Sequence, residues 1–164
     1  MRQYLVHIFK AWLLIPFLNV IGKTKKTQLM QDKLVDLPEG SLGKEMDNWL
    51  KKYKINLIAG YENHDVKHVL TGYQSEGLDE IRLQVFMLGN GNYSLTCLLL
   101  CAMALIFPEE YATFKTDFAK GSLCKSLKNI DLEVHGKENL EDLKEQLGIN
   151  KVNEISSQLN LNVA

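Results

Sequence analysis

Residues 95–107 read Leu-Thr-Cys-Leu-Leu-Leu-Cys-Ala-Met-Ala-Leu-Ile-Phe, a run that is apolar except for Thr96. A helix that is apolar on every side is buried, because no face of it suits water. At a rise of about 1.5 Å per residue the run spans about 20 Å, which is too short to cross a bilayer. The run therefore predicts a buried helix in the core of a helical domain.

The segments on both sides of this run repeat apolar residues with helical spacing. Apolar residues recur three and four positions apart in residues 5–13, 42–50, 78–88, 140–147 and 152–159. No segment alternates convincingly with a period of two, and we find no internal repeat. The 164 residues therefore predict one all-α domain, a bundle of about six to eight helices.

Capping residues mark where these helices should begin and end. Ser41 and Asn63 are suited to N-caps, and Gly72 and Gly148 are suited to C-terminal ends. The expected helices are residues 42–53, 64–71, 108–120 and 139–147, with residues 23–27 interpreted as a polar break.

The charge is unevenly spread along a chain whose formal net charge is −1. Hydrophobic residues make up 46% and charged residues 24%, which argues against disorder and against a polytopic membrane protein. Residues 1–31 are basic and contain no acid. Residues 1–22 are therefore expected to form an amphipathic helix facing an anionic membrane, ahead of a helical core over residues 36–164. A helix packed on that core, or a signal anchor, is the alternative.

The cysteines are Cys97, Cys101 and Cys124. An odd number without a Cys-x-x-Cys pair gives no disulfide framework. All three are expected to be reduced, buried cysteines of a cytoplasmic protein.

A cluster of metal-ligating residue types follows Asn63. On a helix, His64 and His68 are neighbours one turn apart, so both imidazoles can reach one ion. Asp65 lies about 60° from His68, where its carboxylate can ligate directly or orient a histidine ring. Glu80 follows twelve residues after His68, and antiparallel pairing of the two helices would bring its carboxylate to the site. Such a shell suits zinc, manganese or ferrous iron.

The alternative explanation is a chance pattern, because two histidines four residues apart are common on solvated faces. The remaining histidines, His7 and His135, have no ligand-like neighbours and are expected to be ordinary surface or half-buried residues.

The same stretch resembles a known family signature. His-Asp-x-x-His at residues 64–68 is followed by eleven residues and Glu80, and the Val-Leu-Thr-Gly-Tyr run at residues 69–73 is typical of that family. Residues 37–43 and 139–149 look like a turn and a C-terminal helix of its members. By this resemblance the chain is identified as a bacterial member of the ubiquinone (coenzyme Q) biosynthesis protein 4 family.

The resemblance implies a function at a membrane surface. Family members are helical, bind isoprenoid lipids and hold a metal, with His64, Asp65, His68 and Glu80 as the corresponding ligands and catalytic residues. The implied reaction replaces the C1 carboxyl of a prenylated hydroxybenzoate-type precursor by hydroxyl. The expected cofactor is one divalent ion, zinc first, with iron, manganese or magnesium as alternatives. Expected partners are the lipid precursor, the membrane, other quinone-biosynthesis enzymes and a second copy in a homodimer, and no nucleic acid is expected. The expected location is the cytoplasmic side of a bacterial inner membrane.

Two other function classes stay open. The first is a non-catalytic isoprenoid-lipid-binding organiser of a quinone-biosynthesis complex. The second is a metal-dependent phosphohydrolase, which usually needs additional separated His and Asp ligands. In the enzyme interpretation, residues 95–107 form core with a groove for the prenyl tail alongside. Each buried CH₂ contributes about 0.8 kcal/mol, so a long tail could supply most of the binding free energy.

Overall fold

The computed structural model describes residues 25–58, 60–75 and 77–161, and these ranges are built from helices and turns. The elements are α3 (Lys25–Leu34), α4 (Leu42–Tyr53), α5 (Glu62–Thr71), α6 (Leu78–Gly89), α7 (Leu95–Ala102), η2 (Met103–Ile106), η3 (Pro108–Glu110), α8 (Tyr111–Leu123), α9 (Leu132–His135), α10 (Leu140–Leu147) and α11 (Ile149–Leu161). The all-α prediction is confirmed. The elements outnumber the expected helices because the sequence did not indicate α3, α9 and the two 3-10 helices η2 and η3.

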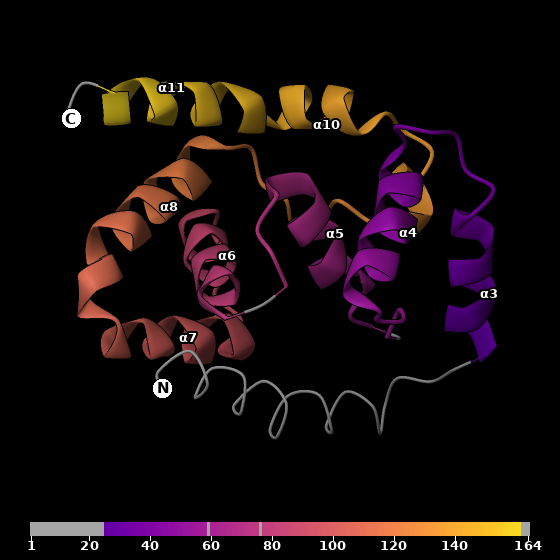
Figure 1. Cartoon of the computed structure of the whole chain (residues 1–164), viewed down its shortest axis with the longest axis horizontal. Helices are drawn as coiled ribbons and strands as arrows, with labels where there is room; N and C mark the ends of the chain where they lie inside the picture. Colours follow the sequence, from indigo (N-terminus) through magenta and orange to yellow (C-terminus); the bar gives the residue numbers. More distant parts are fainter. Residues whose placement is uncertain (1–24, 59, 76, 162–164) are drawn as a thin grey trace.

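Helix α6 lies at the centre of the arrangement (Figure 1), between α5 and α8, with α7 on one side and α10 and α11 on the other. Its Ile81 and Leu83 are completely buried. A side chain at Gly121 of α8 would collide with the backbone carbonyl of Phe86, and one at Gly89 would collide with that of Phe118. The two glycines therefore permit the close approach of α6 and α8.

Some helix boundaries follow the capping signals and others do not. Ser41 caps α4 as predicted, and its hydroxyl accepts the backbone N–H of Lys44. The prediction for Asn63 is wrong, because α5 begins two residues earlier than expected, at Glu62, with Tyr61 at the N-cap. The backbone N–H of His64 donates to the Tyr61 carbonyl, so main-chain bonding sets this start.

Two other boundary predictions are corrected. Residues 23–27 are not a break throughout, since α3 begins at Lys25. The helix expected from Pro108 opens instead with the short 3-10 turn η3, and α8 runs from Tyr111 to Leu123.

The prediction of a fully buried helix over residues 95–107 is wrong in part. The α-helical portion ends at Ala102 and tightens into η2. Cys97 is completely buried, whereas Leu95 is 71% exposed and Leu105 is 72% exposed. The reason is position: α7 lies at the edge of the bundle in Figure 1 and can bury only the face that meets α6.

By length and composition, no single helix in the described ranges could cross a membrane, although Leu95–Ile106 and Pro108–Leu123, bent by 105°, pass that test as a pair.

The predicted amphipathic helix over residues 1–22 lies outside the described residues.

The prediction of three reduced, buried cysteines is confirmed in part. All three thiols are free, but Cys101 and Cys124 are half-buried and Cys97 alone among them is buried.

Candidate metal centre

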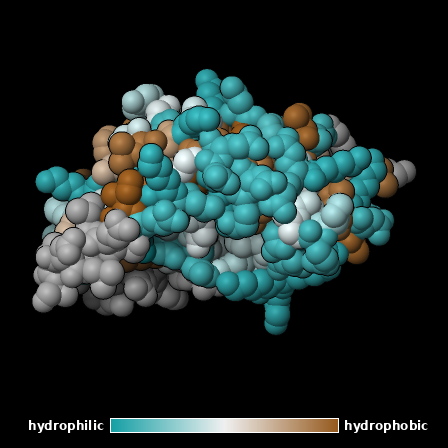
Figure 2. All heavy atoms as spheres, turned by 90° about the horizontal axis from the view of Figure 1, so that it is seen from above, coloured by the Kyte–Doolittle hydropathy of each residue, from teal (hydrophilic) through white to brown (hydrophobic). Residues whose placement is uncertain are grey.

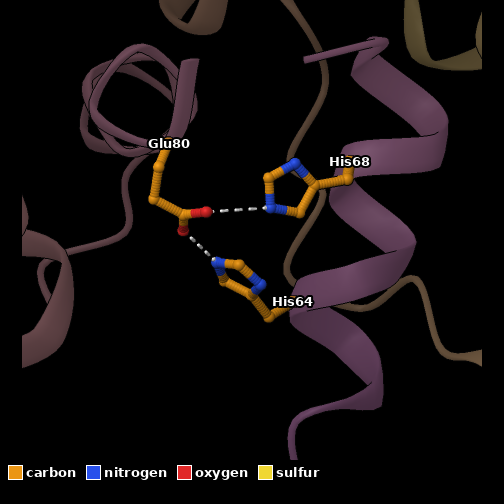
Figure 3. Close-up of side chains that lie close together, drawn as sticks. All are labelled: His64, His68 and Glu80. Carbon is orange, nitrogen blue, oxygen red and sulfur yellow. Dashed lines mark ion pairs between the residues drawn. The ribbon is translucent and has the colours of Figure 1, made fainter. Parts of the chain in front are cut away.

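Three side chains converge between α5 and α6. Figure 3 shows His64 and His68 on consecutive turns of one helix, both pointing at the Glu80 carboxylate of the other. His64 Nε2 lies 3.0 Å from Glu80 Oε1, and His68 Nε2 lies 3.4 Å from Glu80 Oε2. One ligand atom from each residue falls within 4.8 Å of the others. This spacing brings three metal-ligating groups around one point.

Local structure places each of these side chains. Gly72 ends α5 in the left-handed conformation, with φ of 81°, so the chain turns one helical turn after His68. Gly77, also with positive φ, precedes α6. Glu80 is thereby in the first turn of α6, where the helix dipole favours a carboxylate. The turn between the two helices therefore carries Glu80 to the histidines.

His68 is held by its surroundings. Its ring is completely buried, and its Nδ1 lies 3.0 Å from the carbonyl oxygen of Tyr73, to which it donates a hydrogen bond. Trp49 of α4 stacks on the ring, with centroids 5.2 Å apart. With the proton on Nδ1, the lone pair of Nε2 faces Glu80, the orientation that metal-ligating histidines take.

A buried ion pair supports the Tyr73 carbonyl. Asp117 of α8 is 1% exposed and accepts hydrogen bonds from Arg82 Nε at 2.8 Å and from the Tyr73 hydroxyl at 2.6 Å. Burial and the adjacent Asp117 charge raise the pKa of the Tyr73 hydroxyl, so it stays a donor. Helices α6 and α8 are thus tied to the residue that orients His68.

The pKa of His64 is set by opposing influences of burial and of the neighbouring acids. Burial alone would lower its pKa, but the Glu80 charge and the hydrogen bonds to Asp65 and Glu80 outweigh burial and raise the pKa of His64 to about 9. In the absence of a metal, the imidazolium ring therefore neutralises part of the acidic charge. A divalent ion that displaces this proton would supply positive charge at the same place, so the pocket favours a cation.

Asp65 lies on the other side of the His64 ring. Its Oδ1 is 3.5 Å from His64 Nδ1, whereas Glu80 faces Nε2. This position fits the second of the two roles considered for Asp65, that of orienting the ring rather than ligating directly. The role of Asp65 as a direct ligand stays a prediction.

The residues present suit a divalent metal. His68 Nε2 is buried and has no hydrogen-bond partner among the described residues, which is costly unless a cation or a proton meets its lone pair. Two imidazoles and one carboxylate form a donor set typical of zinc, manganese and ferrous iron. Three protein ligands also leave a coordination position open, as catalytic metal sites do.

Sequence reasoning missed two residues at this site. Gln84 is 3% exposed, and its Nε2 lies 3.1 Å from His64 Nε2. It follows Glu80 by one helical turn, so the same spacing rule could have identified it. The Tyr61 ring stacks on His64, with centroids 4.5 Å apart, and its buried hydroxyl has no hydrogen-bond partner among the described residues. No sequence pattern indicated Tyr61.

Of the other two histidines, His135 alone lies among the residues that the structure describes. His135 is half-buried, and its Nδ1 lies 3.0 Å from the Asp131 carbonyl within α9. His7 lies outside the described residues.

Comparison with known protein families gives a match over the region of the site. A family model described as coenzyme Q (ubiquinone) biosynthesis protein Coq4 covers residues 60–153, more than half of the chain. The matched region contains the whole His64, His68 and Glu80 cluster. No curated protein matches the chain.

Proposed function

The chain belongs to the coenzyme Q (ubiquinone) biosynthesis protein Coq4 family, and from this premise we propose that it is a metal-dependent enzyme acting on the head group of a prenylated hydroxybenzoate-type precursor. Involvement in ubiquinone biosynthesis follows from family membership. The proposal adds the reaction, the metal and the place of action, which is the surface of the bacterial inner membrane facing the cytoplasm. The convergence of His64, His68 and Glu80 carries it.

The proposed reaction is oxidative decarboxylation at ring carbon C1. The bond from C1 to the carboxyl carbon breaks, carbon dioxide leaves, and a new bond joins C1 to a hydroxyl oxygen. With molecular oxygen as oxidant, equal amounts of the ring acid, oxygen and water give the phenol, carbon dioxide and hydrogen peroxide. A bound divalent ion would supply Lewis acidity and a template for the carboxylate and phenolate oxygens.

The protein's own residues would bind and orient the substrate. His64, His68 and Glu80 would hold the ion, and Asp65 and the Tyr73 carbonyl would fix the two rings. Burial and the Glu80 and Asp65 charges raise the pKa of Tyr61, so its hydroxyl stays protonated and available to donate a hydrogen bond. We place zinc first, with iron, manganese or magnesium as alternatives.

Lipid binding is supported by exposed apolar side chains. Leu95, Leu98 and Leu99 of α7 are 71%, 45% and 48% exposed. The α10–α11 side, on the opposite side of α6, is mainly hydrophilic in Figure 2. Three neighbouring exposed leucines on one helix suit contact with a prenyl tail or with the interfacial region of a membrane.

Metal content and turnover test the enzyme proposal. Purified protein is analysed for bound elements and incubated in air with prenylated 4-hydroxybenzoate, while carbon dioxide release and phenol formation are measured. We expect about one divalent ion per chain in the wild type, and His68→Ala should lose both the ion and turnover. His135→Ala, the same change outside the cluster, should keep both. Far-ultraviolet circular dichroism establishes that each variant is folded.

The outcomes separate two functions. Metal without turnover, together with a prenyl lipid that co-purifies, would favour the organiser of a quinone-biosynthesis complex. The exposed leucines of α7 are the observation that supports this second candidate. Absence of bound metal from the wild type, even after addition of zinc, iron or manganese, would refute the enzyme proposal.

A further inference from the structure

Gln84 lies at the metal centre without an assigned role. Its side chain is 3% exposed and follows Glu80 by one turn on α6. Its amide Nε2 lies 3.1 Å from the same His64 nitrogen that faces Glu80 Oε1 at 3.0 Å. The Cys97 thiol of α7 donates to the Gln84 carbonyl at 3.3 Å, which fixes this turn of α6. The buried amide therefore lies beside the ring nitrogen on which the metal centre is built.

A metal ion bound at His64 Nε2 excludes a hydrogen bond from the Gln84 amide to that nitrogen, which lies 3.1 Å from the amide. An imidazole nitrogen has a single lone pair, which accepts either an amide N–H or a metal ion. If an ion takes the lone pair of His64 Nε2, the Gln84 amide must find another acceptor close by. A buried amide is rarely left without a partner, because burial without a hydrogen bond is costly.

The nearby groups restrict what the amide can do. Ionised Glu80 and Asp65 are acceptors without protons to donate. An oxygen that fills the open coordination position therefore needs its hydrogen-bond donor from elsewhere. Gln84 offers two N–H groups and carries no charge, so it can meet an oxygen anion without changing the charge of the site.

We propose that Gln84 is a substrate-orienting residue of this centre, whose amide N–H donates to the substrate carboxylate oxygen at the open position. This inference rests on the proposed function. It makes Gln84 a determinant of which acids bind: the carboxylate is held by the ion and by the amide together, and its plane is fixed relative to the ring. The ion itself would be held by His64, His68 and Glu80, and Gln84 would not bind it.

The test uses the full chain loaded with Co²⁺, whose visible spectrum changes when a ligand enters its coordination shell. The probe is 4-hydroxybenzoate, titrated into wild type, Gln84→Leu and Gln84→Glu. Leucine keeps approximate size without hydrogen bonding, and glutamate replaces the donor by an anion. Gln31→Leu on α3, whose amide oxygen accepts the Leu57 N–H, is the control for the same change outside the centre.

The expected results distinguish a role of Gln84 in holding the substrate carboxylate from a role in maintaining the fold. Gln84→Leu should keep its Co²⁺ affinity within about threefold and raise the Kd for 4-hydroxybenzoate about tenfold, the effect of losing a hydrogen bond to a charged group. Gln84→Glu should raise the Kd for 4-hydroxybenzoate at least as much. Gln31→Leu should have the Kd of the wild type. Melting temperatures of the variants check that the fold persists.

Three outcomes would overturn the inference. The first is equal probe affinity in Gln84→Leu and wild type. The second is a wild-type Co²⁺ spectrum that does not respond to the probe. The third is loss of Co²⁺ from folded Gln84→Leu, which would make Gln84 a ligand instead. In the first two cases the metal centre stands, whereas a wild-type protein that binds no Co²⁺ would refute the proposed metal function as well.

Discussion

The charge of Glu80 should control how the stability of the metal-free protein depends on pH. Burial lowers the pKa of His64, and the Glu80 charge is the largest opposing influence, followed by hydrogen bonds to Asp65 and Glu80. Glu80→Gln removes that charge with little change in size. The pKa of His64 should then fall well below its wild-type value of about 9.

The size of the effect follows from the two pKa values. The pKa of His64 rises from 6.5 to about 9 on folding. Because each pKa unit corresponds to 1.36 kcal/mol, protonation of His64 stabilises the fold by about 3 kcal/mol. Because the folded-state pKa is the higher one, this stabilisation is complete below about pH 6.5 and is lost as the pH rises through about 9. The side chain is 15% exposed, so solvent screening is modest.

The assay is urea denaturation in the presence of a chelator, at pH values on both sides of this window. Between the low-pH and the high-pH end of this window, the free energy of unfolding of the wild type should fall by about 3 kcal/mol more than that of Glu80→Gln. Glu145→Gln on α10, the same change at an exposed site, should behave as the wild type. Nuclear magnetic resonance of the His64 Cε1–H follows the pKa directly. Equal pH dependence in wild type and Glu80→Gln would refute this account of the site.

Other predictions address the metal and the scaffold. Metal affinity should rise about tenfold per pH unit below pH 9, because binding displaces the proton of His64, and competition titrations with a chelating dye would show it. Asp65→Asn should weaken metal binding about 10- to 100-fold without abolishing it, whereas complete loss in the same titration would make Asp65 a direct ligand. Gly121→Ala should destabilise the fold by about 1–3 kcal/mol in urea, since its Cβ meets backbone of α6. Asp117→Asn should destabilise the fold by about 1.5–3 kcal/mol, because Arg82 Nε and the Tyr73 hydroxyl lose their charged acceptor, and an unchanged urea unfolding midpoint would contradict that.

The helical class and the centre of the site were accessible from the sequence because both depend on local periodicity. Two histidines four residues apart share a helix face whatever the fold, and a capping residue such as Ser41 acts within a few positions. Gln84 was equally accessible by the same spacing from Glu80, but no motif drew attention to a neutral amide.

The surroundings of the site were not accessible, because they come from segments that are distant in sequence. Trp49 reaches His68 from α4, and Asp117 reaches Tyr73 from α8. The burial of residues 95–107 was mispredicted for a related reason. Apolar composition sets the cost of exposure, but the position of α7 at the edge of the bundle decides which side chains are covered.

By itself, the sequence determined the helical class, most of the helices and the pairing of His64 with His68, since helical geometry repeats every turn without reference to the rest of the molecule. The tertiary structure alone decided that Glu80 meets both rings, that Asp65 lies behind one of them and that Gln84 lies beside the same nitrogen. These distances depend on how α5 and α6 pack, and packing is a property of the whole core.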